Sequence, residues 1–103
     1  RATETALREL TEETGLGCAR LYMAGELDAF YDPVKDRIVH VPFFVAEVES
    51  GAVALDDAHD AHRWVRFEDA AELLAFAAQR RVLGEVHRAF VAREPAPWRL
   101  IRG

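Results

Sequence analysis

Three glutamates stand close together in the segment RELTEETGL, residues 8–16. On a helix, Glu9, Glu12 and Glu13 occupy positions i, i+3 and i+4, whose side chains are neighbours on one face. Like charges at this spacing repel each other, so a chain gains nothing from the arrangement unless something positive binds there. Carboxylates suit Mg²⁺, which keeps open positions for water and substrate phosphates. The segment therefore indicates a binding site for a hard cation. The alternative is an acidic helix face that is simply exposed to solvent.

The elements that position these glutamates begin with a helix. Good helix formers fill residues 2–14, and Gly15 follows at the position where a left-handed C-cap is favoured. At about 100° per residue, Glu9 and Glu13 lie at the border of the apolar face and Glu12 just past them. The face expected to pack on a sheet consists of Thr3, Ala6, Leu7, Leu10 and Thr14.

An extended hairpin is predicted after this helix. Residues 18–31 form either two short strands around Ala24-Gly25 or one strand with a bulge, and the Asp-Pro content of residues 32–36 predicts a turn. Residues 37–48 are rich in β-branched and aromatic side chains, which is typical of a strand. Pro42 within them indicates a sheet edge or a bulge. A turn at residues 49–51 and a short strand at residues 53–55 are expected next.

The C-terminal part is predicted to be helical. A polar loop at residues 56–62 and an extended RWVRF precede helices at residues 68–78 and 81–93, while Pro95 and Pro97 keep the remaining tail non-helical. Together the elements predict an α+β fold. In it a mixed, partly antiparallel sheet lies between the first helix and the C-terminal helices.

Composition limits the functions to consider. The length of 103 residues predicts a single domain, residues 1–103, and the net charge of −5 argues against binding a nucleic-acid polymer. Cys18 is the single cysteine, which rules out an internal disulfide and favours a reducing cytoplasm. The sequence has neither an apolar run of membrane-spanning length nor a signal-peptide pattern, so no membrane partner is expected.

The glutamate segment resembles the core of the Nudix box, in which Arg-Glu-hydrophobic-any-Glu-Glu-any-Gly-hydrophobic follows an upstream Gly and Glu. The front of that box falls before Arg1. The resemblance therefore implies an α/β/α sandwich that lacks its N-terminal strands here. The matching positions are Arg8, Glu9, Leu10, Glu12, Glu13, Gly15 and Leu16.

The resemblance implies a hydrolase that cleaves a nucleoside diphosphate-linked substrate. Its metal, Mg²⁺ or Mn²⁺, would be held by Glu9, Glu12 and Glu13, and the catalytic residues would be Glu9, Glu12 and Arg8. Arg8 would orient the helix by pairing with the absent upstream Glu. The alternative for Arg8 is an exposed pair with Glu4 or Glu12. Because no Gly-rich phosphate loop occurs, the metal has to supply most of the binding to phosphate.

The middle of the chain resembles a bacterial Nudix subgroup described as similar to dATP pyrophosphohydrolases. A (deoxy)nucleoside triphosphate, cleaved to a monophosphate and pyrophosphate, is therefore the first expected substrate. His59 and Trp64 also fit a pattern of some diadenosine tetraphosphate hydrolases, which makes dinucleoside polyphosphates the runner-up. Ala58 replaces a Glu of that pattern. The general base is left open among Asp56, Asp57 and His59.

Three side chains outside the box are candidates for contact with the nucleotide: Tyr31, His59 and His62. The alternatives are core packing for Tyr31 and functionless exposure for the two loop histidines, and Trp64 is expected in the core. Two further functional classes stay open, a non-catalytic Nudix-fold binding module and a domain whose acidic helix binds a basic protein. The expected partner is a small nucleotide in the cytoplasm, with a homodimer as an open alternative.

Overall fold

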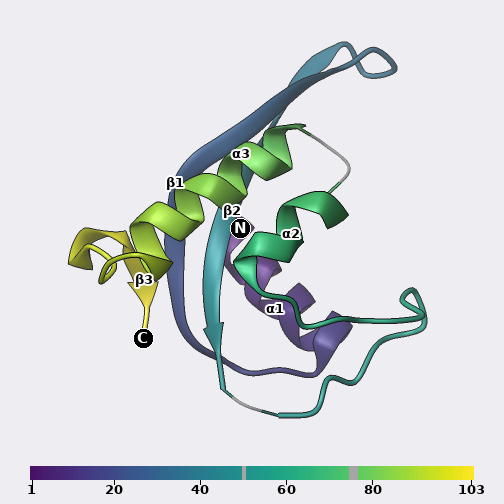
Figure 1. Cartoon of the computed structure of the whole chain (residues 1–103). Helices are drawn as coiled ribbons and strands as arrows, with labels where there is room; N and C mark the ends of the chain where they lie inside the picture. Colours follow the sequence, from purple (N-terminus) through teal and green to yellow (C-terminus); the bar gives the residue numbers. More distant parts are fainter. Residues whose placement is uncertain (50, 75–76) are drawn as a thin grey trace.

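The computed structural model describes residues 1–49, 51–74 and 77–103 of the chain (Figure 1). The predicted first helix and the second predicted strand are confirmed with the bounds expected for them. The elements in chain order are α1 (Ala2–Thr14), β1 (Cys18–Asp32), β2 (Arg37–Val48), α2 (Phe67–Leu73), α3 (Ala77–Val86), the π-helical turn η1 (His87–Val91), the 3-10 turn η2 (Pro97–Arg99) and β3 (Leu100–Arg102).

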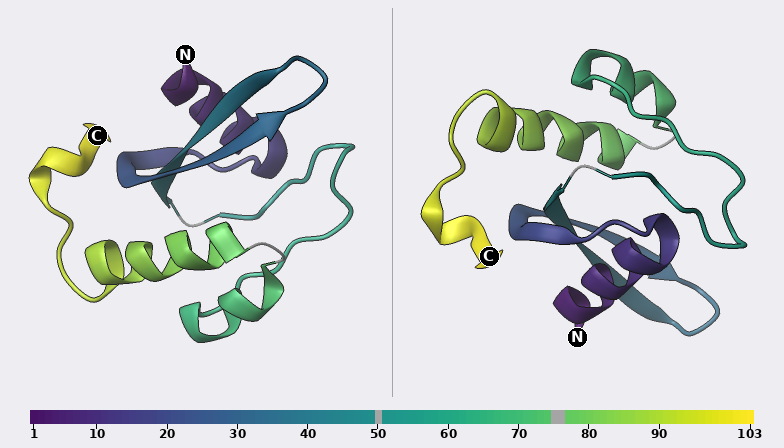
Figure 2. Two further views of the ribbon diagram at one scale, coloured as in Figure 1. Left: turned by 90° about the horizontal axis from the view of Figure 1, so that it is seen from above. Right: turned by 90° about the horizontal axis from the view of Figure 1, so that it is seen from below.

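The sheet forms the middle layer of the molecule. Its strand order is β2-β1-β3, with β1 in the centre. Helix α1 lies against one face and α3 against the other, and both views of Figure 2 show the strands between these helices. This arrangement confirms the expected α+β sandwich. Both pairings found among the described strands are antiparallel.

β1 is one long strand interrupted by an irregularity, which settles the two alternatives for residues 18–31. The register with β2 shifts between Met23 and Leu27, and Gly25 has a φ of +81°. Pro42 pairs with Leu27 just beyond this shift. Among the described elements β2 is an edge strand, and an edge strand next to an irregularity is where a sheet tolerates proline, as the sequence predicted.

The core of the described residues is small and lies where β1 meets α3. Tyr22 packs edge-on against Phe90 with ring centroids 5.2 Å apart. Helix α1 contributes no fully buried side chain, and its predicted inner face is only half-buried. The buried side chains are Leu16, Leu21, Tyr22, Ala24 and Val82.

The C-terminal half departs from the prediction in three places. Residues 53–55 form no strand, and α2 ends at Leu73, where the following Leu74 is extended with φ −92° and ψ 127°. Residues 75 and 76 of the predicted second helix, and residue 50 of the predicted turn, lie outside the described residues. The next helix begins at Ala77 and passes into a π-helical turn that ends at Val91.

The predicted irregular tail instead completes the sheet. Pro97 starts a 3-10 turn, because its fixed φ suits the first position of a helical turn. Leu100 and Arg102 then pair with β1. The prolines do prevent an α-helix, but they leave the last residues free to extend. None of the helices in the described ranges is long and apolar enough to cross a membrane.

Candidate functional site

The end of α1 is held by several local hydrogen bonds. Gly15 adopts φ +72° and donates its N–H to the Thr11 carbonyl at 2.8 Å, the C-cap that was predicted. The Thr14 hydroxyl donates to the Leu10 carbonyl at 2.6 Å and accepts the N–H of Leu16 at 3.2 Å. These bonds fix the direction in which the chain leaves the helix that carries the glutamates.

The predicted metal-ligand residues lie on accessible parts of α1. Glu9 and Glu12 are exposed, and Glu13 is half-buried. The carboxylate of Glu12 is 3.5 Å from the guanidinium of Arg8, and both side chains are more than half exposed. An exposed pair at this spacing contributes roughly 0.3–0.5 kcal/mol, so it steers Glu12 without locking it.

Glu9 and Glu13 border a groove between α1 and β2. The groove has a volume of about 300 Å³ and includes Pro42 and Phe44 of β2. Polar and apolar atoms both line it, so a ligand that reaches the carboxylates meets an apolar wall beside them. The wheel of α1 predicted this placement, because it put both glutamates at the border of the packing face.

The three glutamates suit a divalent cation by donor chemistry and by position on the helix. Three carboxylates within two turns offer the oxygen ligands that Mg²⁺ and Mn²⁺ take. They are not drawn together in advance, because no three Asp, Glu, His or Cys side chains of the described ranges gather as a metal site. The residues therefore fit such an ion, and the exposed side chains have the freedom to converge on it.

The loop between β2 and α2 is attached to the end of α1. The backbone N–H of Ala54 donates to the Thr14 carbonyl at 2.8 Å. A Cβ on Gly15 would lie 3.2 Å from the Cβ of Ala54, so the two chain segments are in close contact. The residues at 53–55 thus serve as an attachment point on α1 rather than as the short strand that was expected.

Asp56 and His59 form a pair on this loop. His59 Nδ1 and Asp56 Oδ1 are 2.6 Å apart, and the His59 N–H approaches the Asp56 carbonyl at 3.3 Å. The hydrogen bond to Asp56 raises the pKa of His59, to which the charges of Glu13 and Asp60 add. The hydrogen bond from His59 in turn lowers the pKa of Asp56. The hydrogen bond from Ala54 to Thr14, two residues before Asp56, connects this part of the loop to the end of the glutamate-bearing helix.

Asp56 and His59 were predicted as separate candidates for the general base, and their pairing was not predicted from the sequence. The signal was present, because an Asp three residues before a His in a polar loop can close a turn through both side chain and backbone.

His62 lines a second groove on α1. This groove has a volume of about 310 Å³ and lies between the C-terminal half of α1, the end of β2 and the loop. Trp64 is 67% exposed, so its expected place in the core is wrong. Arg63, which the sequence analysis did not single out, also lines the groove and is recognisable only once the loop is seen to fold back.

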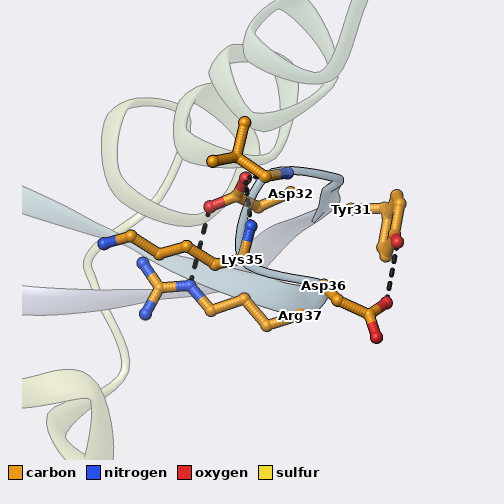
Figure 3. A network of polar contacts seen from close by, with 6 residues as sticks. Tyr31, Asp32, Lys35, Asp36 and Arg37 are labelled. Atoms are coloured by element: carbon orange, nitrogen blue, oxygen red, sulfur yellow. Dashed lines mark hydrogen bonds and ion pairs between the residues drawn. The ribbon is translucent and has the colours of Figure 1, made fainter.

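Tyr31 lies apart from these residues. Its hydroxyl hydrogen-bonds Asp36 at 2.7 Å within the β1–β2 hairpin, and this bond raises its pKa (Figure 3). Asp32 organises the same turn, accepting from the Val34 N–H and approaching Arg37 at 3.7 Å. The hairpin tip extends beyond the helices in Figure 1, and Tyr31 is 58% exposed. The described contacts therefore do not bring Tyr31 to the glutamates.

Comparisons with known proteins agree with the sequence resemblance. A family model described as the NUDIX domain matches residues 1–89. A bis(5'-nucleosyl)-tetraphosphatase [asymmetrical] of Mus musculus is 32% identical over 96 residues, which cover 90% of this chain and 65% of the relative. The protein of the same name from Rattus norvegicus is 32% identical over 99 residues, with the same coverage of 90% and 65%. The chain thus spans slightly less than two thirds of the length of these relatives.

Proposed function

Since this chain belongs to the Nudix family, we propose that the protein hydrolyses a pyrophosphate linkage in a nucleoside diphosphate-linked substrate. The observation that carries the proposal is the meeting of two elements. Exposed carboxylates project from α1, and a loop with Asp56, His59 and His62 is attached to the end of that helix. Carboxylates alone would make a cation seat, whereas the loop adds groups that can bind substrate and carry protons.

The glutamates have the central role in this proposal. Glu9, Glu12 and Glu13 would hold Mg²⁺ or Mn²⁺, which would neutralise charge on the phosphate oxygens and lower the pKa of a bound water. Without the cation the three carboxylates would repel the phosphates of the substrate. The groove of about 300 Å³ beside Glu9 and Glu13 supports this role, because it leaves room for substrate next to the carboxylates.

Arg8 acts in this proposal as a positioning residue. Its guanidinium lies 3.5 Å from the Glu12 carboxylate, one helical turn away. This is one of the two alternatives raised for Arg8 from the sequence. Arg8 then keeps the Glu12 side chain on the accessible side of α1. Replacing Arg8 would leave the Glu12 side chain less well ordered but would remove no metal ligand.

We propose a dinucleoside polyphosphate as the substrate. The two relatives carry the name of a bis(5'-nucleosyl)-tetraphosphatase, and their similarity covers 90% of this chain, including the loop with His59 and Trp64. This favours the runner-up of the sequence analysis over a nucleoside triphosphate. The groove lined by His62, Arg63 and Trp64 suits one nucleoside of such a substrate, because it combines apolar walls with a cation and an aromatic ring.

The test is a product assay of the full-length protein with Mg²⁺ or Mn²⁺. The substrates compared are diadenosine tetraphosphate, nucleoside triphosphates, ADP-ribose and nucleotide sugars. Cleavage of diadenosine tetraphosphate to ATP and AMP, well above the rate for the others, is expected. Release of pyrophosphate from a triphosphate as the fastest reaction would restore the first expectation from the sequence. Metal binding without turnover of any substrate would instead identify a binding module.

A cytoplasmic location accompanies this proposal. Its support is the single Cys18 and the small nucleotide substrates that the family implies. A tagged full-length protein that fractionates outside the cytoplasm would contradict it.

A further inference from the structure

The Asp56–His59 pair has the geometry of an oriented base. A neutral imidazole has one N–H and one lone pair, and the partner of one nitrogen decides which nitrogen carries the proton. Asp56 Oδ1 lies 2.6 Å from His59 Nδ1, which favours a proton on that nitrogen. The other nitrogen, Nε2, is then left with its lone pair, and the side chain is 46% exposed, so water can reach it.

The loop that carries the pair is hydrogen-bonded to the end of α1. The Ala54 N–H bonds to the Thr14 carbonyl at 2.8 Å, only two residues before Asp56. The charge of Glu13 acts on His59, although the hydrogen-bond partner of the imidazole is Asp56. The charged groups that act on His59 are therefore Asp56 and Asp60 from the loop and Glu13 from α1.

We propose that His59, oriented by Asp56, is the general base of the hydrolysis. This inference rests on the proposed function and names a catalytic residue for it. His59 Nε2 takes one proton from the attacking water as the water oxygen forms its bond to phosphorus. The phosphoanhydride P–O bond breaks, and the leaving phosphate departs with the electron pair of that bond. The imidazolium then returns its proton to solvent, and no other reactant is consumed.

Asp56 is a positioning residue in this scheme and touches no reacting atom. Its carboxylate holds the Nδ1 proton and stabilises the imidazolium that forms when Nε2 accepts a proton. Removal of this carboxylate should leave a base that is weaker and less well oriented. Replacing His59 and replacing Asp56 should therefore have different kinetic effects, and this difference distinguishes a catalytic role of the pair from a structural one.

The first test is steady-state kinetics of the full-length protein with diadenosine tetraphosphate and Mg²⁺. His59→Ala should lower kcat by about 10²–10⁴-fold with little change in KM, the usual contribution of a general base. His40→Ala is the matched control, because His40 is an exposed histidine of β2 away from the loop. If the wild type is active and the kcat of His59→Ala is within threefold of it, the role of His59 as general base is overturned, while the proposed hydrolysis stands.

The second test is the pH profile of kcat for Asp56→Asn. Only a neutral His59 accepts a proton, so activity should fall as pH drops through the pKa of His59. Because Asp56 raises that pKa, the acidic limb of Asp56→Asn should move to lower pH. A lower kcat with an unmoved acidic limb would indicate a structural role and overturn the proposal. A larger loss from Asp57→Asn than from His59→Ala would assign the base to Asp57 instead.

The third test needs no turnover. A ¹⁵N NMR titration of the metal-free protein should show His59 protonated at Nδ1 in its neutral form, with a pKa that falls in Asp56→Asn. A His59 pKa that is the same in both proteins would show that the pair does not exist in solution. An inactive wild-type protein would overturn the proposed function and the base together, whereas the kinetic outcomes above affect only the base.

Discussion

The backbone N–H of Ala54 donates a hydrogen bond to the carbonyl of Thr14 at 2.8 Å. Thr14 is the last residue of α1, and Ala54 lies in the loop between β2 and α2, two residues before Asp56. The geometry of the candidate site therefore depends on how α1 ends. Gly15 lies directly at this junction with φ +72°, a conformation that costs roughly 1–2 kcal/mol for a residue with a Cβ.

Gly15→Ala should lower the free energy of unfolding by roughly 1–2 kcal/mol and also lower kcat/KM. The added Cβ would lie 3.2 Å from the Cβ of Ala54, so the loop must move as well as the helix end. Urea unfolding measures the first effect and nucleotide hydrolysis the second. Gly17→Ala is the control, because no heavy atom lies within 4 Å of its added Cβ. Equal losses of stability and activity in Gly15→Ala and Gly17→Ala would contradict a special role for the contact between the end of α1 and Ala54.

The sequence predicted well those elements whose causes are local. The helix at residues 2–14 follows from its good helix formers and a C-cap glycine, and the strand at residues 37–48 from its β-branched and aromatic residues. The loop attachment at Ala54 and the strand at residues 100–102 depend on partners far away in the chain. No local pattern identifies those partners. The sequence therefore predicted a short strand at residues 53–55 and a non-helical tail at the end of the chain.

Glu12→Gln and Glu13→Gln should each lower turnover by orders of magnitude. A neutral amide binds Mg²⁺ poorly, and without the bound cation the negative charge of the substrate phosphates is not neutralised. Glu13→Gln should leave stability unchanged or raise it slightly, because like-charge repulsion with Glu9 is relieved. In Glu12→Gln the same relief is offset by the loss of the ion pair with Arg8, so little net change in stability is expected. Isothermal titration with Mg²⁺ or Mn²⁺ and urea unfolding measure binding and stability separately.

Glu4→Gln is the control for these two variants. Glu4 lies in the first turn of α1, more than one helical turn before Glu9. Its replacement should leave metal binding and turnover unchanged. Near-normal activity of both Glu12→Gln and Glu13→Gln would remove the argument for a metal seat on α1.

Arg99→Lys should destabilise the C-terminal strand. The Arg99 guanidinium donates to the Ala24 carbonyl at 2.7 Å and also lies 4.6 Å from the centre of the Trp98 ring. A lysine cannot reproduce both contacts, because it lacks the planar donor fork. The expected loss is roughly 1 kcal/mol by urea unfolding, with faster hydrogen exchange at β3.

Gly25→Ala tests the same contact from the other side. A Cβ at Gly25 would lie 2.8 Å from Arg99 Nη1, and the φ of +81° adds backbone strain. This variant should therefore destabilise β3 at least as much as Arg99→Lys. Arg93→Ala, an exposed arginine on the neighbouring turn, is the control and should change stability by less than about 0.5 kcal/mol. Wild-type exchange rates at β3 in Gly25→Ala would show that the contact does not hold the strand.

The candidate site was predicted in its residue types more than in its arrangement. The helical spacing predicted Glu9 and Glu13 at the border of the packing face of α1, and both side chains line the groove between α1 and β2. Tyr31 was grouped with the loop histidines, whereas its described contact is with Asp36 in the β1–β2 hairpin, and its role toward a nucleotide stays a prediction. The pairing of Asp56 with His59 depends on a loop turn, which sequence patterns define weakly.

The Asp56–His59 pair should make stability depend on pH within a defined window. The pKa of His59 is raised from 6.5, so its contribution is fully present below about 6.5 and is lost as pH rises through the raised value. The pKa of Asp56 is lowered from 3.8, so its contribution is present above 3.8 and is lost as pH falls through the lowered value. The pair therefore stabilises the protein most between these limits.

Asp56→Asn should accordingly be less stable than wild type at a pH of about 5.5 and similar to it at about 9. Urea unfolding at the two pH values measures the difference, and His59→Gln should give the same pattern because it removes the other partner. Both side chains are accessible, so about 0.5 M NaCl should reduce the difference at the lower pH. Asp57→Asn, which leaves the pair intact, should show no such pH dependence. A deficit of Asp56→Asn that is equal at both pH values would mean that the pair contributes through packing rather than through charge.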